Sequence, residues 1–375
     1  MKTKLTGLLL ILVSWVSACV EPFELGVVSD LRILTVDATL TDILQEQRIT
    51  ISESFNAKGT AFNSPVLNAS VELLVNGKEV IQFIEKGDGI YALPTNFKLK
   101  KGDNYQLSFK KTDGSGYMSA IEKLIEVPEI LNVHDEFYEE GILRGEKYIP
   151  ANFIYVDTKD PGEEKNNYLW TWQLWEKQDI CITCEGGRYL ENIRACRPQN
   201  EYQGLFFDYY CEGDCWEIMR SSELNVLNDF TSNGKVISNR LVAEIPYYTT
   251  NGALIEISQQ SISLAAYNYL KLLADQTQNT GTLVDTPPAA LIGNIKNINN
   301  SDEPIAGFFM IKSIKNKRYW IDRAIPNRLK IKTVGLRDHT FSPEPPVSGE
   351  FGRPPLVKCL LSPTRTPHKP DGWLQ

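Results

Sequence analysis

The stretch "ASVELLVNGKEVIQFIEKGDGIYALP", residues 69–94, alternates apolar and polar side chains between turn signals. Alternation with a period of two is typical of a strand that buries one face. The turn signals are Asn76-Gly77 and Asp88-Gly89, dipeptides that supply the positive φ angles of tight hairpins. The pattern recurs in "LKKGDNYQLSFKK", residues 99–111. Together these residues predict a β-sandwich of the immunoglobulin-like or carboxypeptidase-regulatory-like kind.

The same short alternating runs extend outward over residues 31–128, which we expect to form one β-sandwich domain closed by Pro128. Residues 129–375 then predict a second β-rich domain with a proline-rich tail over 341–375. One helix stands out at about 264–277, where apolar residues fall at helical spacing and Ser263 precedes them as an N-cap. The predicted fold class is therefore mainly β, with one prominent helix.

The N-terminus has the composition of a secretory signal. Lys2 and Lys4 precede an apolar run over 5–16, which is shorter than the roughly 20 residues that span a bilayer. The run ends in "VSAC", residues 16–19, which resembles the bacterial lipobox. We expect residues 1–18 to be removed, Cys19 to be acylated, and residues 19–30 to form a lipidated tether. An ordinary signal peptide with an incidental cysteine is the alternative.

Composition and charge fit a protein of the cell envelope. The 375 residues carry a net charge of −8, which argues against nucleic acid as a partner. The charge is uneven: residues 131–290 hold 12 Lys and Arg against 24 Asp and Glu, whereas residues 291–340 hold 10 against 4. After removal of residues 1–18, about 357 residues remain, a length that suggests two domains or three.

Six cysteines remain when Cys19 is set aside, and five of them lie in an insertion over 181–215. An even number in an oxidising compartment predicts up to three disulfides. A zinc site is the alternative, but the second close pair has a Cys-x₃-Cys spacing, and thiolates outside the cytoplasm are open to oxidation. Six cysteines allow fifteen pairings, and the sequence leaves the choice among them open. The disulfide candidates are Cys181, Cys184, Cys196, Cys211, Cys215 and Cys359.

Two concentrations of aromatic and basic residues are candidates for a partner surface. The first is the basic run over 312–332, and the second lies within the cysteine-rich insertion. Exposed aromatic side chains on a disulfide-bonded loop suit recognition. The alternatives are a solvated strand face for the basic run and core packing for the aromatic residues. The candidate surface residues are Lys315, Lys317, Arg318, Trp320, Tyr209 and Tyr210.

Residues 263–322 carry a family resemblance. They show a Ser-Leu-x-x-Tyr helix start, a Gly-x-Leu-x-Asp-x-x-Pro turn, Gly-Asn-Ile and Pro-x-x-Gly-Phe. This order of motifs resembles the outer-membrane lipoproteins of Bacteroidota catalogued as domain of unknown function 4249. The matching positions are Ser263, Leu264, Tyr267, Gly281, Leu283, Asp285, Pro288, Gly293, Asn294, Ile295, Pro304, Gly307 and Phe308. The C-terminus departs from the family's Cys-x-x-Cys ending, so Cys359 is expected to pair with the cysteine cluster.

The resemblance implies a location more than a reaction. Family members look like outer-membrane lipoproteins that genome context often associates with TonB-dependent transporters, and no catalytic residues are assigned to them. We expect a non-catalytic subunit without cofactor or metal, anchored to outer-membrane lipid through Cys19 and working with an outer-membrane β-barrel in ligand capture or complex assembly. Display at the cell surface is favoured over a periplasmic orientation. The alternative is a surface-anchored hydrolase acting on glycan or peptide, although the sequence holds only three histidines and no Gly-x-Ser-x-Gly.

Overall fold

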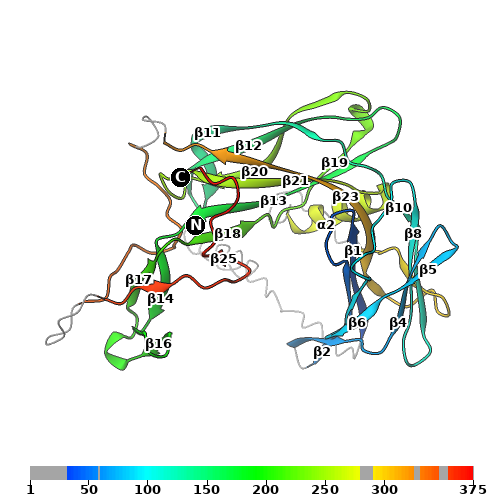
Figure 1. The fold of residues 1–375 in the computed structure, drawn as a ribbon, viewed down its shortest axis with the longest axis horizontal. Helices are drawn as coiled ribbons and strands as arrows, with labels where there is room; N and C mark the ends of the chain where they lie inside the picture. The colour runs from blue at the N-terminus through cyan, green and yellow to red at the C-terminus, as the bar shows by residue number, and fades with distance from the viewer. Residues whose placement is uncertain (1–31, 58–59, 279–289, 325–329, 346–353, 375) are drawn as a thin grey trace, which may run out of the picture.

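The computed structural model describes residues 32–57, 60–278, 290–324, 330–345 and 354–374 (Figure 1). The predicted lipidation site Cys19, the signal over 1–18, the tether over 19–30 and part of the family motif, residues 281–288, lie outside the described residues. The described chain is mainly β, as predicted, and its α-helix is α2 (Leu264–Thr277). No described helix is long and apolar enough to cross a membrane.

The N-terminal sandwich packs two sheets face to face. Its first sheet contains β1 (Ile33–Thr41), β2 (Arg48–Ala57), β3 (Thr60–Pro65), β6 (Ile84–Gly87) and β7 (Ile90–Ala92). Its second sheet contains β4 (Ser70–Val75), β5 (Glu79–Gln82), β8 (Asn104–Lys110), β9 (Gly116–Ser119), β10 (Glu122–Lys123) and β22 (Ile295–Asn297). Alternate residues of the facing strands, among them Leu40, Ile51, Leu73 and Leu107, are fully buried between them. The alternating pattern in the sequence is therefore the core of this sandwich.

The hairpin between β4 and β5 has the predicted turn. Asn76 and Gly77 both adopt positive φ, at 53° and 65°, which matches the right-handed twist of the flanking strands. The turn brings Val75 opposite Glu79 and fixes the register of the pair, so that Leu73 stays on the buried face.

Strands from the far end of the chain complete this sandwich. β22 pairs with β9, and β23 (Ile305–Ile321) runs parallel to β1 from Leu34↔Ile305 to Thr41↔Lys312. Phe309 and Ile311 of β23 are buried in the sandwich core. The predicted domain of residues 31–128 is therefore incomplete by itself, because a parallel partner for β1 must come from a distant part of the chain. β23 is a single strand of 17 residues, long enough to reach beyond this sandwich.

The same β23 continues into a second sandwich module. Its later half pairs with β21 (Ala253–Ser261), which pairs with β13 (Asn167–Lys177). The sheet is extended by β18 (Trp216–Arg220), β19 (Asn225–Asn228) and β25 (Arg365–Thr366). It is covered by a sheet of β11 (Ile130–Arg144), β12 (Lys147–Lys159) and β20 (Val236–Pro246). One continuous sheet thus joins the two modules through β23 (Figure 1).

Helix α2 packs where the two modules meet. Its N-cap is Ser263, as predicted, and the Ser263 Oγ accepts a hydrogen bond of 3.1 Å from the backbone N–H of Ala266. Ala266 and Leu270 are buried against Phe308 of β23 in a small apolar cluster. The helix therefore covers the sheet at the point where β23 passes from one module to the other.

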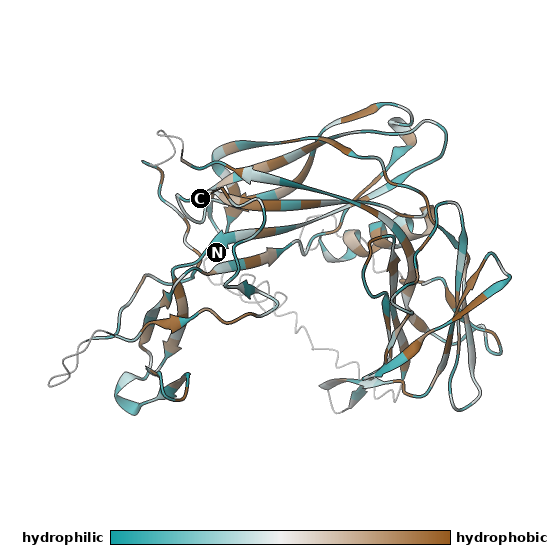
Figure 2. Cartoon of the chain, viewed as in Figure 1, coloured by the Kyte–Doolittle hydropathy of each residue, from teal (hydrophilic) through white to brown (hydrophobic). Residues whose placement is uncertain are grey.

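A small cysteine-rich module lies at the opposite end of the molecule from the N-terminal sandwich (Figure 1). Its central sheet is β14 (Ile180–Glu185), β17 (Phe206–Glu212) and β24 (Val357–Lys358), with a hairpin of β15 (Gly187–Leu190) and β16 (Ala195–Pro198) and the short helix η1 (Asn200–Tyr202). Hydrophobic residues appear in the strands of this module as in the two larger ones (Figure 2). The described part of the proline-rich tail contributes β24 to this module and β25 to the sheet of the second sandwich module.

Candidate binding surface on the cysteine-rich module

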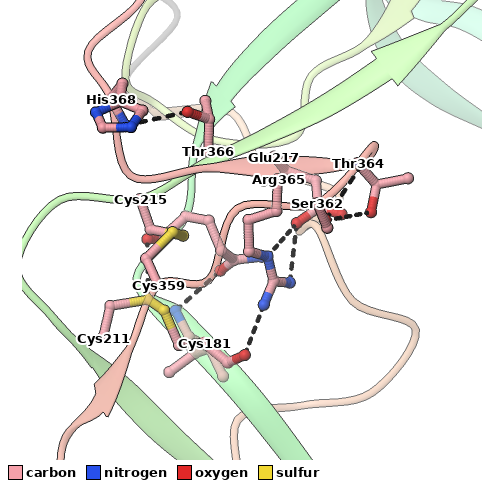
Figure 3. Close-up of a disulfide and its surroundings, with 12 residues drawn as sticks. Cys181, Cys211, Cys215, Glu217, Cys359, Ser362, Thr364, Arg365, Thr366 and His368 are labelled. Carbon is pink, nitrogen blue, oxygen red and sulfur yellow. Dashed lines mark hydrogen bonds and ion pairs between the residues drawn. A yellow bond between two sulfur atoms is a disulfide. The ribbon is translucent and has the colours of Figure 1, made fainter.

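All six of the remaining cysteines form disulfides, as predicted. The pairs are Cys181–Cys211, Cys184–Cys196 and Cys215–Cys359. Cys359 pairs with the cluster, in keeping with the expectation drawn from the family's C-terminal pattern. Figure 3 shows that the first and third of these disulfides lie side by side.

The disulfides hold a module that has little core of its own. Cys181–Cys211 joins β14 to β17, and Cys184–Cys196 joins β14 to the outer hairpin. The buried side chains between them, besides the cystines, are Tyr189, Phe207, Tyr209 and Val357. Cys215–Cys359 ties the tail to the start of β18 over a separation of 144 residues. Cross-links of this kind stabilise a small core mainly by restricting the unfolded chain.

The carboxylate of Asp208 on β17 holds the start of the tail and the residues just before it. The Asp208 side chain is buried and accepts hydrogen bonds from the Thr183 hydroxyl at 2.6 Å, the Ser342 amide at 2.9 Å and His339 Nε2 at 3.1 Å. Burial favours a raised pKa for Asp208, but the hydrogen bonds from these three groups, together with the nearby charge of Arg337, bring the pKa below its ordinary value. Asp208 is therefore an anion that fixes the tail at neutral pH.

A second buried carboxylate, Glu344, belongs to the tail itself and lies two residues after Ser342. It attaches the tail to side chains of the module. It is buried and is bound by the Arg188 guanidinium and the Tyr209 hydroxyl. The Tyr209 oxygen in turn accepts the Tyr189 amide at 2.9 Å. Burial, and then the bonded Glu344 carboxylate, raise the pKa of Tyr209 well above its usual range. The segment from Arg337 to Glu344 is thus fixed to the module at both ends.

This arrangement creates a partly exposed aromatic strip, which we define as Phe206, Tyr210, His339 and Phe341. Phe206 stacks on His339 with ring centroids 5.2 Å apart, and Tyr210 lies 5.0 Å from Phe341. Phe206 and Tyr210 are 39% and 46% exposed although both are aromatic. Because residues two apart share a face of a strand, Asp208 lies between them and fixes the tail residues that complete the strip.

A pocket of about 400 Å³ opens between the outer hairpin and the tail. Its wall mixes apolar side chains with charged and hydroxyl groups: Cys181, Ile182, Tyr189, Glu191, Arg194, Glu212, Leu356, Val357, Lys358, Leu360, Ser362, Thr364 and Arg365. Arg365 donates to Glu217 at 2.9 Å and to the Cys181 carbonyl at 2.6 Å (Figure 3). The Ser362 and Thr364 hydroxyls lie 3.4 Å from each other. The pocket wall offers hydrogen bonding, ion pairing and apolar contact to a bound molecule.

The residues predicted to form a partner surface are not brought together. Tyr209 is 1% exposed and belongs to the core, whereas Tyr210 belongs to the aromatic strip. The basic residues alternate along β23 and therefore point to opposite faces of its sheet. The basic side chains and Trp320 all contact other residues of the same chain. Lys315 pairs with Glu129, Lys317 donates to the carbonyls of Ile130 and Leu131, Arg318 pairs with Glu256 and Asp371, and the Trp320 ring contacts that of Trp373.

The sequence alone does not indicate the two residues that complete the strip. His339 and Phe341 lie about 130 residues from β17 in the chain, and no local pattern links them to Tyr210. The sequence did contain one indication of this site. Phe206, Asp208 and Tyr210 are spaced two residues apart, so in a strand they share one face, with a carboxylate between two aromatic rings.

These modules define the class of protein: a disulfide-bonded, β-rich molecule of joined sandwiches that carries a partly exposed aromatic strip on its cysteine-rich module. The chain belongs to the family described as Domain of unknown function (DUF4249), whose model matches residues 20–318. No curated protein and no solved structure matches it. The matched segment ends before His339, Phe341 and Cys359, so the family match does not include the residues that complete the strip or those of the tail that line the pocket.

Proposed function

We propose that this protein is a non-catalytic lipoprotein of the outer membrane that serves as an accessory binding subunit of an outer-membrane β-barrel complex of the TonB-dependent transporter type. Its role is to help capture a ligand or to stabilise the complex. Membership of the DUF4249 family and the lipobox-like sequence that ends at Cys19 support this assignment. In this proposal the acylated Cys19 holds the chain at the lipid surface, facing outward from the cell.

The observation that carries the proposal is the aromatic strip. Aromatic residues that are rigidly held and partly exposed are typical of the central contacts of protein interfaces. Here Asp208 and Glu344 fix the tail and the disulfides fix the strand, so the strip is ordered before any partner binds. A surface ordered in advance loses less conformational entropy on association.

The test is co-purification from membranes extracted with a mild detergent. The tagged wild-type chain should bring down a β-barrel protein at a defined stoichiometry. The double variant Phe206→Ser/Tyr210→Ser should lose at least ten-fold of that recovery. Phe230→Ser is the matched control, because Phe230 is 88% exposed on η2 (Asp229–Thr231) in the second module, away from the strip. Recovery of the wild type as a lone chain would refute the proposal, as would equal loss in the control.

Anchoring is tested separately. A Cys19→Ala chain should leave the membrane fraction and appear in the soluble fraction, because acyl chains at that residue are the proposed attachment. A Cys19→Ala chain that still sediments with membranes would refute the anchor without bearing on the aromatic strip.

A surface hydrolase for glycan or peptide is the second candidate, favoured by one observation. His339 Nε2 lies 3.1 and 3.2 Å from the two carboxylate oxygens of Asp208, which is the carboxylate–imidazole half of a catalytic triad. No serine, threonine or cysteine side chain among the described residues is hydrogen-bonded to His339. Hydrolysis of a glycan or peptide substrate that disappears in His339→Gln would favour this candidate over the accessory subunit.

A further inference from the structure

Four sulfur atoms gather at the base of the cysteine-rich module. The Sγ atoms of Cys181, Cys215 and Cys359 all lie within 4.8 Å of one another, and Cys211 is bonded to Cys181. They come from four separate segments: β14, the end of β17, the loop before β18 and the tail after β24. Figure 3 shows the two disulfides facing each other at this point. The remaining disulfide, Cys184–Cys196, is not a member of this group.

The spacing of these sulfurs is close to that of a four-thiolate metal site. Zinc binds cysteine thiolates at about 2.3 Å in a tetrahedron, which places the sulfurs roughly 3.8 Å apart. The Cys215 and Cys359 sulfurs are bonded at 2.08 Å and must separate by about 1.7 Å once reduced, whereas the Cys181 sulfur lies within 4.8 Å of both and is at most about 1 Å too far. The fourth, on Cys211, needs only to separate from Cys181 once their bond is broken.

The surroundings are also those of a structural metal site. Cys215 is fully buried, Cys181 is 7% exposed, and the other two are partly buried in the same apolar cluster. Cys181 also lines the pocket, whose charged residues are the cations Arg194, Lys358 and Arg365 and the carboxylates Glu191 and Glu212. Soft sulfur ligands in this number select ions such as Zn²⁺ or Cd²⁺ over Mg²⁺ or Ca²⁺.

We propose that the reduced forms of Cys181, Cys211, Cys215 and Cys359 together bind one zinc-like ion, so that this cluster is an alternative to the two disulfides. The reductant is a dithiol: each disulfide accepts two electrons and two protons from one dithiol, which itself becomes a disulfide. Two dithiols therefore yield four cysteine thiols. Binding of one Zn²⁺ then releases up to four protons as the thiols become thiolates.

The proposal has a structural consequence. Cys359 is the covalent attachment of the tail to the rest of the module, and reduction alone removes that bond. With the metal bound, Cys359 remains joined to Cys181, Cys211 and Cys215 through the ion. The cluster thus keeps the tail, and with it the pocket wall, in place under reducing as well as oxidising conditions.

The experiment uses the full mature chain, reduced without denaturant by a dithiol under anaerobic conditions and then freed of the reductant. Titration with Cd²⁺ should give one ion per chain and an ultraviolet thiolate-to-cadmium charge-transfer band. Cys181→Ser/Cys359→Ser should weaken Cd²⁺ binding at least a hundred-fold, whereas the matched control Cys184→Ser/Cys196→Ser should bind as the wild type does. No band in the reduced wild type would overturn the proposal. Equal weakening in the control would do the same, because it would indicate adventitious binding by unfolded thiols.

A second measurement needs no substitution and so does not depend on whether a variant folds. The reduced wild type is alkylated with iodoacetamide in the presence and absence of Zn²⁺, and each cysteine is followed by peptide mass spectrometry. Zn²⁺ should slow alkylation of the four cluster cysteines at least ten-fold and leave Cys184 and Cys196 unchanged. Uniform protection of all six, or of none, would contradict the assignment.

Discussion

Removal of the Cys215–Cys359 disulfide should destabilise the protein more than removal of either other disulfide. In the chain-entropy model, the stabilisation rises with the logarithm of the number of residues that a disulfide encloses. Cys215–Cys359 has a separation of 144 residues and Cys184–Cys196 a separation of 12. These separations correspond to about 5 and about 3 kcal/mol at 25 °C. The two double serine variants should therefore differ by about 2 kcal/mol in the free energy of unfolding.

The assay is guanidinium unfolding followed by tryptophan fluorescence. Trp216 directly follows Cys215, and its ring lies 5.8 Å from that of Trp373 in the tail, so the signal reports on the region that the disulfide joins. The separation of 30 residues for Cys181–Cys211 places its variant between the other two. Equal losses for all three variants, or the largest loss for Cys184→Ser/Cys196→Ser, would refute the reasoning, because the effect would then not come from restriction of the unfolded chain.

Three further predictions concern the two sandwich modules and the end of the tail. Glu122 is 2% exposed, and burial raises its pKa to about 7. The free energy of unfolding should therefore be highest below about pH 4.5, the ordinary pKa of the unfolded state, and should be lower by about 3 kcal/mol once the pH has risen through 7. Thermal unfolding at pH 5 and pH 8 should show that Glu122→Gln removes this difference. Arg323→Ala should cost about 3–5 kcal/mol by leaving the fully buried Glu176 carboxylate unpaired, and the double variant Glu176→Gln/Arg323→Met should recover much of that loss in urea unfolding. Trp373→Ala should cost about 3–5 kcal/mol through lost packing on Trp216, with a weakened near-ultraviolet circular dichroism signal as the check; an unchanged signal would exclude the contact.

Much of the local structure could be predicted from the sequence because it is set by short-range rules. The alternation in residues 69–94 predicted β4, and the positive φ preference of Asn76-Gly77 predicted its hairpin. Ser263 and the apolar spacing after it predicted α2 within the bounds that the structure has. Each of these signals acts between residues that are neighbours in the chain.

The candidate site could be predicted only in part. The six cysteines indicated disulfides, and Tyr210 was among the candidate contact residues. The basic run, the other candidate concentration, lies on β23, where Lys315 and Lys317 lie on one face of the sheet and Arg318 on the other, and these side chains make ion pairs and hydrogen bonds within the chain. Tyr209 was included as one of the aromatic residues concentrated in the insertion, although the strand turns its ring into the core.

By itself the sequence determined the mainly β class, the hairpins, the helix and the presence of disulfides, since periodicity, turn residues and cysteine count are properties of the chain alone. Only the tertiary structure decided that β23 joins two modules, that Cys359 pairs with Cys215, and that Phe341 lies on Tyr210. The physical reason is that contacts between distant segments depend on how the whole chain buries its apolar surface. No local pattern specifies which of the many partners at long range a strand, a cysteine or an aromatic ring will meet.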